Sequence, residues 1–260
     1  HPELAAFAIA RPDQLDRSLP RHADGWVRAL DDGQVARYAV LLDAIIAAVP
    51  GDVACEILST HPYPLRRAVE RHGLGRFRVT QKADLDRADD GYRGENARPE
   101  DWIMLGNHDT PPIRAVAARW MADGSARGRA HRLAARLVPD PAGREAFARA
   151  AAASARALAQ ASFAELFLGP ARQVFVYFTD LLGETASYNV PGTVSQENWS
   201  LRIPADVRAR YRARCAEGAA PSVPRALAAA LRARGGAFSA AHAGLASALE
   251  AADPAGGSAR

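Results

Sequence analysis

The sequence predicts an α/β fold in which about four parallel strands form half of a (β/α)₈ barrel. Three observations support this prediction: short apolar runs indicate strands, helical segments fill the longer connections between them, and polar residues follow the strands. Alternating strands and helices favour a parallel sheet joined by right-handed crossovers. Polar groups at the carboxyl ends of parallel strands form the active-site edge of such barrels. A doubly wound sheet is the alternative, but no glycine-rich phosphate loop follows any strand.

The four expected strands are short apolar or alternating runs. They are Val53–Leu58, Arg76–Gln81, Trp102–Asn107 and Gln173–Phe178. The third is the most informative, because Asn107, His108 and Asp109 arrive together where this strand should end, just after Gly106. Asp109 or Thr110 could instead cap a helix that starts near Ile113.

Helical spacing of apolar residues predicts most of the remaining structure. Helices are expected at Glu3–Ala10, Gln34–Ala48, Pro64–His72 and Pro224–Arg234, with three or four more between residues 113 and 168. The polar stretch 82–100 should be a long loop, and residues 180–204 a surface segment over the strand ends. Residues 254–260 should be a frayed tail. We expect a partial barrel domain at residues 1–204 and a helical segment packing on it at residues 205–260.

Composition narrows the functional classes. Hydrophobic residues make up 48% of the chain, and the formal charge is +4 with a pI near 9.4. Arginines are interspersed with acids and Lys82 is the only lysine, so nucleic-acid binding is not expected. No membrane span or signal peptide is evident, and the separate Cys55 and Cys215 favour a reduced, cytoplasmic protein. Because the chain begins at His1 without methionine, we expect a processed protein or a piece of a longer one.

Metal and serine-hydrolase chemistry have little support. His108 and Asp109 are adjacent, so they would point to different sides of a strand, and no paired histidine or cysteine motif accompanies them. A strained Gly-x-Ser-x-Gly turn is also missing. No metal and no cofactor are therefore expected.

Several motifs, taken in order, resemble the carboxyl-terminal half of the 4-alpha-glucanotransferases, the amylomaltases or disproportionating enzymes of glycoside hydrolase family 77. The resemblance covers about residues 50–204. Its motifs are Ala54-Cys-Glu-Ile-Leu58, Leu105-Gly-Asn-His-Asp-Thr110, Thr179-Asp-Leu-Leu-Gly183, Tyr188-Asn-Val-Pro-Gly-Thr193 and Asn198-Trp199. Each motif alone is weak, whereas the combination is specific.

This resemblance implies roles for individual residues. Glu56 would end the fifth barrel strand as general acid/base, and Asp109 would end the seventh as the carboxylate that stabilises the transition state. Maltooligosaccharides or alpha-1,4-glucans would be bound through Asn107, His108, Asn189 and Trp199. Each role has a plainer alternative. These are a salt bridge from Glu56 to Arg76 or Arg78, a simple turn at Asn189, and a core position for Trp199.

The family mechanism is retaining and needs a nucleophilic aspartate at the end of the fourth strand. No Arg-Ile-Asp-His type motif occurs here, so the nucleophile and the amino-terminal half of the barrel are expected upstream. The apolar neighbours of Glu56 should favour its neutral acid form. A non-catalytic, glucan-binding half-barrel is the alternative function. A lone half-barrel would expose sheet edges and one sheet face, so we expect marginal stability or self-association.

Overall fold

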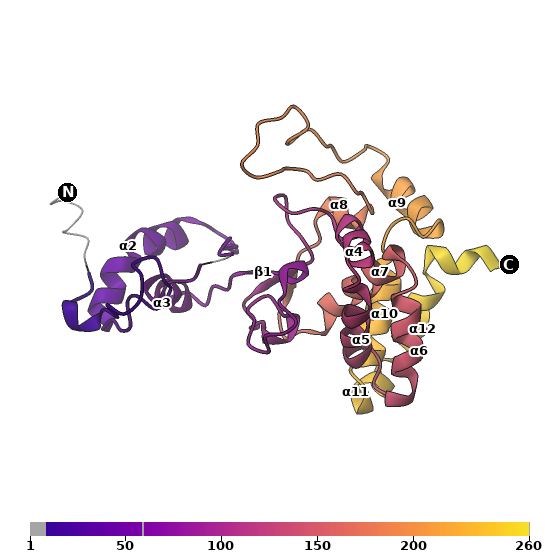
Figure 1. The fold of residues 1–260 in the computed structure, drawn as a ribbon, viewed down its shortest axis with the longest axis horizontal. Coiled ribbons are helices and arrows are strands. Elements are labelled where there is room, and N and C mark those ends of the chain that lie inside the picture. Colours follow the sequence, from indigo (N-terminus) through magenta and orange to yellow (C-terminus); the bar gives the residue numbers. More distant parts are fainter. Residues whose placement is uncertain (1–8, 59, 260) are drawn as a thin grey trace. The chain divides into compact units, whose positions relative to one another are not determined.

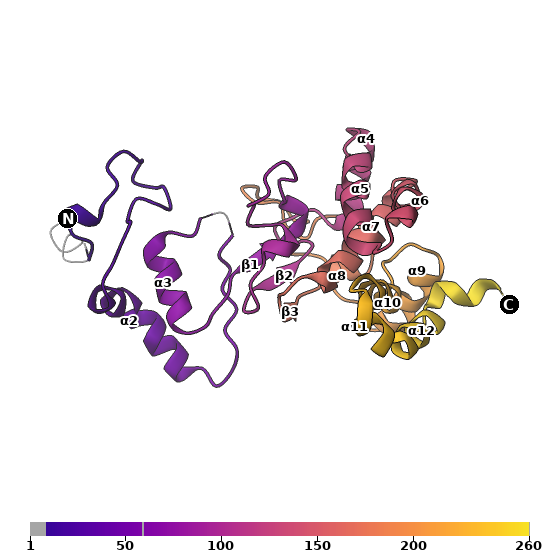
Figure 2. The ribbon, with the colours of Figure 1, turned by 90° about the horizontal axis from the view of Figure 1, so that it is seen from below.

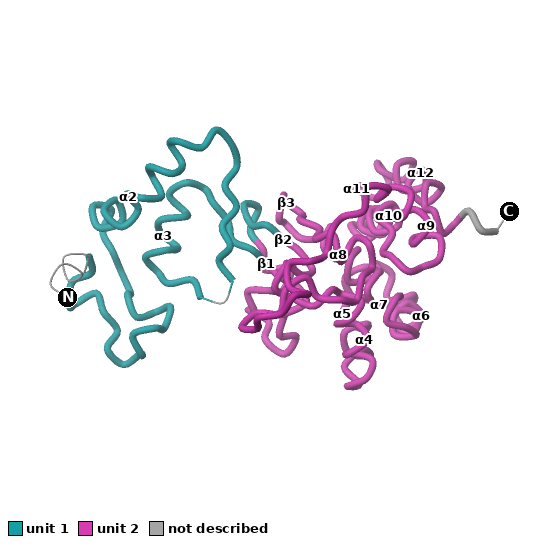
Figure 3. The backbone as a smooth tube through the Cα atoms, turned by 90° about the horizontal axis from the view of Figure 1, so that it is seen from above, with its two compact units in different colours: residues 1–77, 98–102 teal, residues 78–97, 103–260 magenta. Residues whose placement is uncertain are grey.

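The computed structural model describes residues 9–58 and 60–259. The chain divides into two compact units, which Figure 3 colours separately. Unit 1 comprises residues 1–77 and 98–102, and unit 2 comprises residues 78–97 and 103–260. Most of the helix expected at Glu3–Ala10 lies outside the described residues. The expected domain boundary after residue 204 falls inside unit 2 and stays a prediction.

Unit 1 is built around two helices, α2 (Asp32–Ala48) and α3 (Tyr63–Arg71), which pack against each other (Figure 1). A short 3-10 helix, η1 (Pro12–Gln14), precedes them. A capping box starts α2, because the Asp31 carboxylate accepts from the backbone N–H of Gln34 and the Gln34 side chain accepts from that of Asp31. Gly73, at φ 62°, follows the end of α3. Both helices were predicted from their spacing.

The sheet is parallel and has three strands in the order β1-β2-β3: β1 (Phe77–Val79), β2 (Trp102–Met104) and β3 (Gln173–Val174). Figure 2 shows the strands side by side. All three are shorter than predicted, and Phe178 begins a helix instead of ending a strand.

The prediction of a strand at Val53–Leu58, the first of the four expected, is wrong. Among the described residues it forms only an isolated parallel bridge between Cys55 and Arg76. The Arg76 guanidinium donates to the backbone carbonyls of Ile57 and Leu58. These side-chain bonds satisfy carbonyls that would otherwise seek partners in a strand ladder.

Four helices follow β2 in unit 2: α4 (Ile113–Ala122), α5 (Ala126–Leu137), α6 (Pro141–Ala151) and α7 (Ala155–Glu165). Their number agrees with the prediction of three or four helices. Asp140 caps α6 and Ser154 caps α7. The main core lies among these helices and β2, with Ile103, Ile113, Leu158 and Phe163 fully buried.

The remaining helices are α8 (Phe178–Leu181), α9 (Val207–Ala216), α10 (Val223–Ala233), α11 (Gly236–Ala241) and α12 (Ala243–Ala251). Helix α10 packs against α7 and α12, as its expected amphipathic pattern suggests. Between α8 and α9 the chain makes a long excursion without helix or strand, visible in Figure 1. The expected frayed tail is instead a 3-10 helix, η5 (Pro254–Ala259). None of the helices in the described part is long and apolar enough to span a bilayer.

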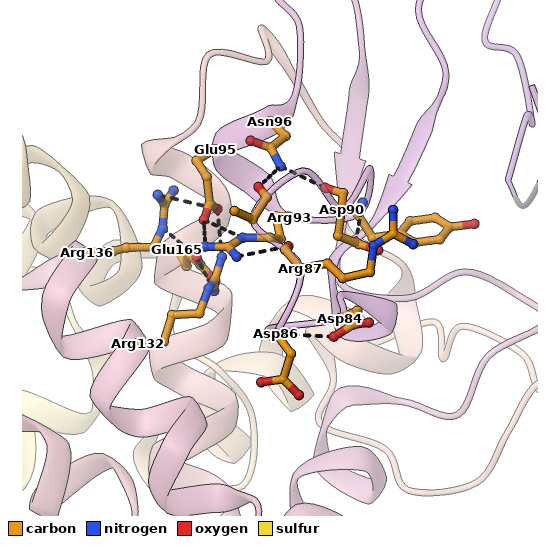
Figure 4. A network of polar contacts seen from close by, with 12 residues as sticks. Asp84, Asp86, Arg87, Asp90, Arg93, Glu95, Asn96, Arg132, Arg136 and Glu165 are labelled. Carbon is orange, nitrogen blue, oxygen red and sulfur yellow. Dashed lines mark hydrogen bonds and ion pairs between the residues drawn. The ribbon is translucent and has the colours of Figure 1, made fainter.

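Residues 82–97 form an ordered loop with 3-10 turns η2 (Thr80–Lys82) and η3 (Gly94–Asn96) near its ends. Figure 4 shows the polar network that holds it against α5 and α7. Arg132 lies 2.7 Å from Glu95 and 2.8 Å from Glu165, and Arg136 lies 2.5 Å from Glu165. Arg93 adds an ion pair to Glu95 at 2.9 Å. Burial opposes the charge on Glu95, but its backbone hydrogen bond and Arg136 and Arg132 together hold its pKa below the ordinary value.

Candidate functional site

The turn after β2 is shaped by its own side chains. The backbone N–H of Asn107 donates to Thr110 Oγ1 at 2.8 Å, and that hydroxyl donates back to the Asn107 carbonyl at 3.1 Å. Asn107 Oδ1 also accepts from the backbone N–H of Asp109 at 3.1 Å. These local bonds form an Asx turn, with Asn107 and Thr110 buried beneath the half-buried His108 and Asp109. Asn107 therefore shapes the turn, and its expected contact with sugar stays a prediction.

Gly106 is required where this turn begins. A Cβ atom here would lie 2.5 Å from Thr110 Oγ1 and 3.0 Å from Gln81 Nε2. The Gln81 amide donates to the Pro111 carbonyl at 3.1 Å, so it is held in place. The glycine thus allows the close approach of neighbouring side chains.

The alternative role of Asp109 or Thr110 as a helix cap is wrong. The carboxylate at the start of α4 is that of Asp180, which accepts from the backbone N–H of Ile113 at 2.6 Å. Asp180 is only 2% exposed, and this burial raises its pKa to about 6, against the opposing effect of hydrogen bonds from Ile113 and Gly106. Asp180 was expected to begin the surface segment 180–204, but it is buried and ties α8 to α4 from inside the protein.

Asp109 contacts Asn189, which lies far along the chain. Its Oδ1 accepts from Asn189 Nδ2 at 2.6 Å, and the Asn189 backbone N–H donates to the His108 carbonyl at 3.1 Å. His108 Nε2 lies 3.5 Å from Asp109 Oδ1. Asn189 is therefore more than a simple turn residue. The structure brings together three candidate site residues, Asp109, His108 and Asn189, whose roles stay predictions.

An aromatic cluster adjoins these groups. The ring centroids of His108 and Trp199 are 5.4 Å apart, and Trp199 contacts Tyr188 edge-on at 5.2 Å. Tyr188 in turn contacts Tyr177 and Phe178. Trp199 is 51% exposed, so its alternative role as a core residue is wrong. It is also the only described residue other than glycine with positive φ, at 62°.

Tyr177 is a part of the site that sequence reasoning missed. Burial, the neighbouring Tyr188 and the charge of Asp109 raise its pKa to about 12. Its phenol therefore stays neutral at any ordinary pH. The expected strand Gln173–Phe178 placed Tyr177 inside the strand, whereas β3 ends at Val174, so the sequence pattern did not point to Tyr177.

Glu56 lies in unit 1, whereas the other candidate residues lie in unit 2. The expected apolar surroundings of Glu56 are wrong, because its side chain is exposed. The bridge of Cys55 to Arg76 replaces the buried strand that would have enclosed it. Its role as an acid facing Asp109 and its salt bridge to Arg76 or Arg78 both stay predictions. In the described part of the chain, no three His, Cys, Asp or Glu side chains gather as a metal site.

Comparisons with known proteins identify relatives. A family model described as 4-alpha-glucanotransferase, glycoside hydrolase family 77, matches residues 34–207. Among curated proteins none matches the chain. An amylomaltase from Streptococcus agalactiae in complex with acarbose is similar with a TM-score of 0.46 and 16% identity, over 70% of this chain and 35% of that one. An amylomaltase from Corynebacterium glutamicum gives 0.34 and 21%, over 66% and 27%.

The match to this chain thus covers only 35% and 27% of the lengths of these two solved structures. The family match covers more than half of the residues and includes every candidate site residue. The chain belongs to the 4-alpha-glucanotransferase family, glycoside hydrolase family 77.

Proposed function

We propose that this chain supplies the carboxyl-terminal half of the (β/α)₈ barrel of a 4-alpha-glucanotransferase, which transfers alpha-1,4-glucan segments between maltooligosaccharide acceptors. Asp109 is the carboxylate that stabilises the transition state, and Glu56 is the general acid/base. His108, Asn107, Asn189 and Trp199 bind the sugar. The observation that carries the proposal is the Asp109 carboxylate held by Asn189 beside the His108–Trp199 pair, in a chain of this family.

This arrangement suits a sugar ring. An aspartate fixed by an amide and flanked by an imidazole presents acceptors and donors to hydroxyl groups, while the half-exposed Trp199 offers an apolar face. The Asp109 carboxylate stabilises the positive charge that develops at the anomeric carbon in an oxocarbenium-like transition state. Tyr177, as a neutral donor near Asp109, adds a further positioning group.

The proposed reaction proceeds in two displacements. A nucleophilic aspartate upstream of this chain attacks the anomeric carbon as the bond to the leaving oxygen breaks and Glu56 donates its proton to that oxygen. An acceptor hydroxyl then attacks the same carbon, the ester bond to the aspartate breaks, and Glu56 takes the hydroxyl proton. Retention requires the nucleophile and the acid to lie about 5–5.5 Å apart.

Binding of acarbose to the isolated chain tests the sugar site directly. Calorimetric titration should show binding that is weakened about tenfold or more in D109N and N189A, since each loses a charge-assisted contact. D86N is the matched control, because Asp86 is an exposed carboxylate outside the cluster. Equal binding by D109N and D86N would contradict the proposed site.

Turnover separates the transferase from the alternative function. The isolated chain should release no glucose from maltotriose, because it lacks the nucleophile motif. A longer protein, in which an aspartate at a strand end precedes this chain, should release glucose. Its E56Q variant should lose this activity. Acarbose binding without turnover in that longer protein would favour the non-catalytic, glucan-binding half-barrel. Rapid turnover by the isolated chain would contradict the upstream nucleophile.

A further inference from the structure

Unit 2 contains a cavity that Asp109 does not line. A cavity of about 440 Å³ opens among α6, α7, α9, α10 and the segment that joins α9 to α10. Alanine is the most frequent residue in its wall, and Leu137 and Phe147 are its largest apolar side chains. Its volume falls in the range of small-molecule pockets, which are mostly apolar with a few placed polar groups. None of the candidate sugar-binding residues lines it.

The polar groups of the cavity wall are nearly all satisfied within the protein. Gln160 exchanges two hydrogen bonds with the backbone of Ser222, at 2.7 and 3.2 Å. Arg225 is paired with Asp253 at 2.6 Å. Because these groups are already paired within the protein, they give no indication of a ligand.

Two further arginines on the wall differ, because in the described part of the chain neither forms an ion pair with a carboxylate. Arg114 donates from Nη1 to the Ala219 carbonyl at 2.6 Å, but its buried Nε has no partner. Arg156 makes one long bond of 3.3 Å to the Glu217 carbonyl. Burial and the positive charges of Arg156 and Arg214 lower the pKa of Arg114. The cavity edge therefore carries excess positive charge beside an apolar interior.

We propose that this cavity binds an amphipathic anion, an alkyl carboxylate of medium chain length. The carboxylate would accept hydrogen bonds from the guanidinium groups of Arg114 and Arg156, and the alkyl chain would pack on the alanine wall. Arginine suits this head group because its planar donors match a carboxylate. A sugar fits poorly, because its many hydroxyl groups would find few free partners and Phe147 is the only aromatic ring in the wall.

Titration with decanoate tests the proposal on the whole chain. Calorimetry below the micelle concentration should show saturable binding of decanoate and none of decyltrimethylammonium, which has the same tail and the opposite charge. Decanol should bind more weakly than decanoate. Absence of decanoate binding, or equal binding of the cationic and anionic amphiphiles, would overturn the proposal.

Variants locate the bound anion. R156M and R114M should each weaken decanoate about tenfold, as expected for loss of a charge-assisted contact, while R149M on the exposed side of α6 should not. A229F should abolish binding by filling the cavity. Circular dichroism checks folding, and R156M remains informative if A229F does not fold, because Arg156 is exposed.

The same variants keep this proposal separate from the sugar site. Acarbose binding should be unchanged in A229F and R156M, and decanoate binding unchanged in D109N. Decanoate affinity that stays at the unmodified level in A229F and R156M would place the anion elsewhere and contradict the inference.

Discussion

Two long loops of unit 2 are held in different ways. The first, residues 82–97, is fixed by ion pairs through Glu95 to arginines of α5. The second, residues 183–204, carries Asn189 and Trp199, is largely exposed, and is held mainly by hydrogen bonds and ring contacts at the site. Neither loop has a strand or α-helix of its own.

The difference between ion pairs and exposed hydrogen bonds indicates how firmly each loop is held. Buried charges that lose a partner are costly, so a network of them fixes a loop in one position. Exposed hydrogen bonds contribute little and open easily, which would suit the proposed role of the second loop in admitting and releasing a ligand. We therefore expect the first loop to act as scaffold and the second to move with substrate.

The largest effect should come from breaking the network of the first loop. Glu165, whose side chain is 9% exposed, faces both Arg132 and Arg136. E165Q leaves these two charges half paired and should lower the free energy of unfolding by about 3 kcal/mol. Urea unfolding measures it, and E145A, at an exposed position on α6, should change stability by less than about 0.5 kcal/mol. Similar losses in both variants would remove the contrast between the loops.

The next effect concerns pH and the buried Asp180 at the root of the second loop. In the folded protein its pKa is raised to about 6, so between its ordinary value of 3.8 and pH 6 folding takes up a proton. Stability from this group is therefore greatest at low pH and falls as pH rises through that window, by about 3 kcal/mol in total.

The variant D180N isolates this contribution, because its amide does not titrate. The stability of D180N minus that of the unmodified protein should rise between pH 4 and 6 and then level off above pH 6. Urea unfolding at several pH values measures the difference. A flat difference across the window would show that Asp180 titrates normally.

A smaller effect is expected within the second loop. Asn198 accepts from the backbone N–H of Val190 at 3.1 Å and donates to the Thr193 carbonyl at 3.2 Å, and both Val190 and Thr193 are exposed. N198A should leave global stability within about 1 kcal/mol while hydrogen exchange in the loop speeds up about fivefold. Global destabilisation as large as that of E165Q would mean that the second loop is scaffold as well.

The smallest effect concerns the strained backbone of Trp199. Its left-handed conformation disfavours any residue with a side chain, so W199G should be more stable than W199A by about 1 kcal/mol at most. Both variants should lose acarbose affinity alike, because both remove the ring. Thermal unfolding and acarbose titration separate the two contributions.

Helices and turns were predictable because their signals are local. Apolar spacing located α2, α3 and α10, and the prediction of three or four helices between residues 113 and 168 is confirmed. The strand at Val53–Leu58 failed because its carbonyls are bound by the Arg76 side chain, a contact that no local pattern reveals.

The site was predictable only in part. Motif order placed Asp109, His108, Asn189 and Trp199 together, and the structure joins them. The roles of Tyr177 and Asp180 depend on burial and on partners distant in sequence, so neither followed from the pattern. The ion pairs of Glu165 were missed for the same reason, since a glutamate near the end of a helix is usually solvated.

The close packing around Gly106 limits which substitutions this position can tolerate. Any β-carbon there would displace Thr110 Oγ1, whose two bonds to Asn107 shape the turn that presents Asp109. Even alanine, the mildest replacement, would disturb the carboxylate without touching it. In a saturation library selected for glucan binding, this position should tolerate no replacement, whereas the solvent-facing Arg149 should accept nearly all.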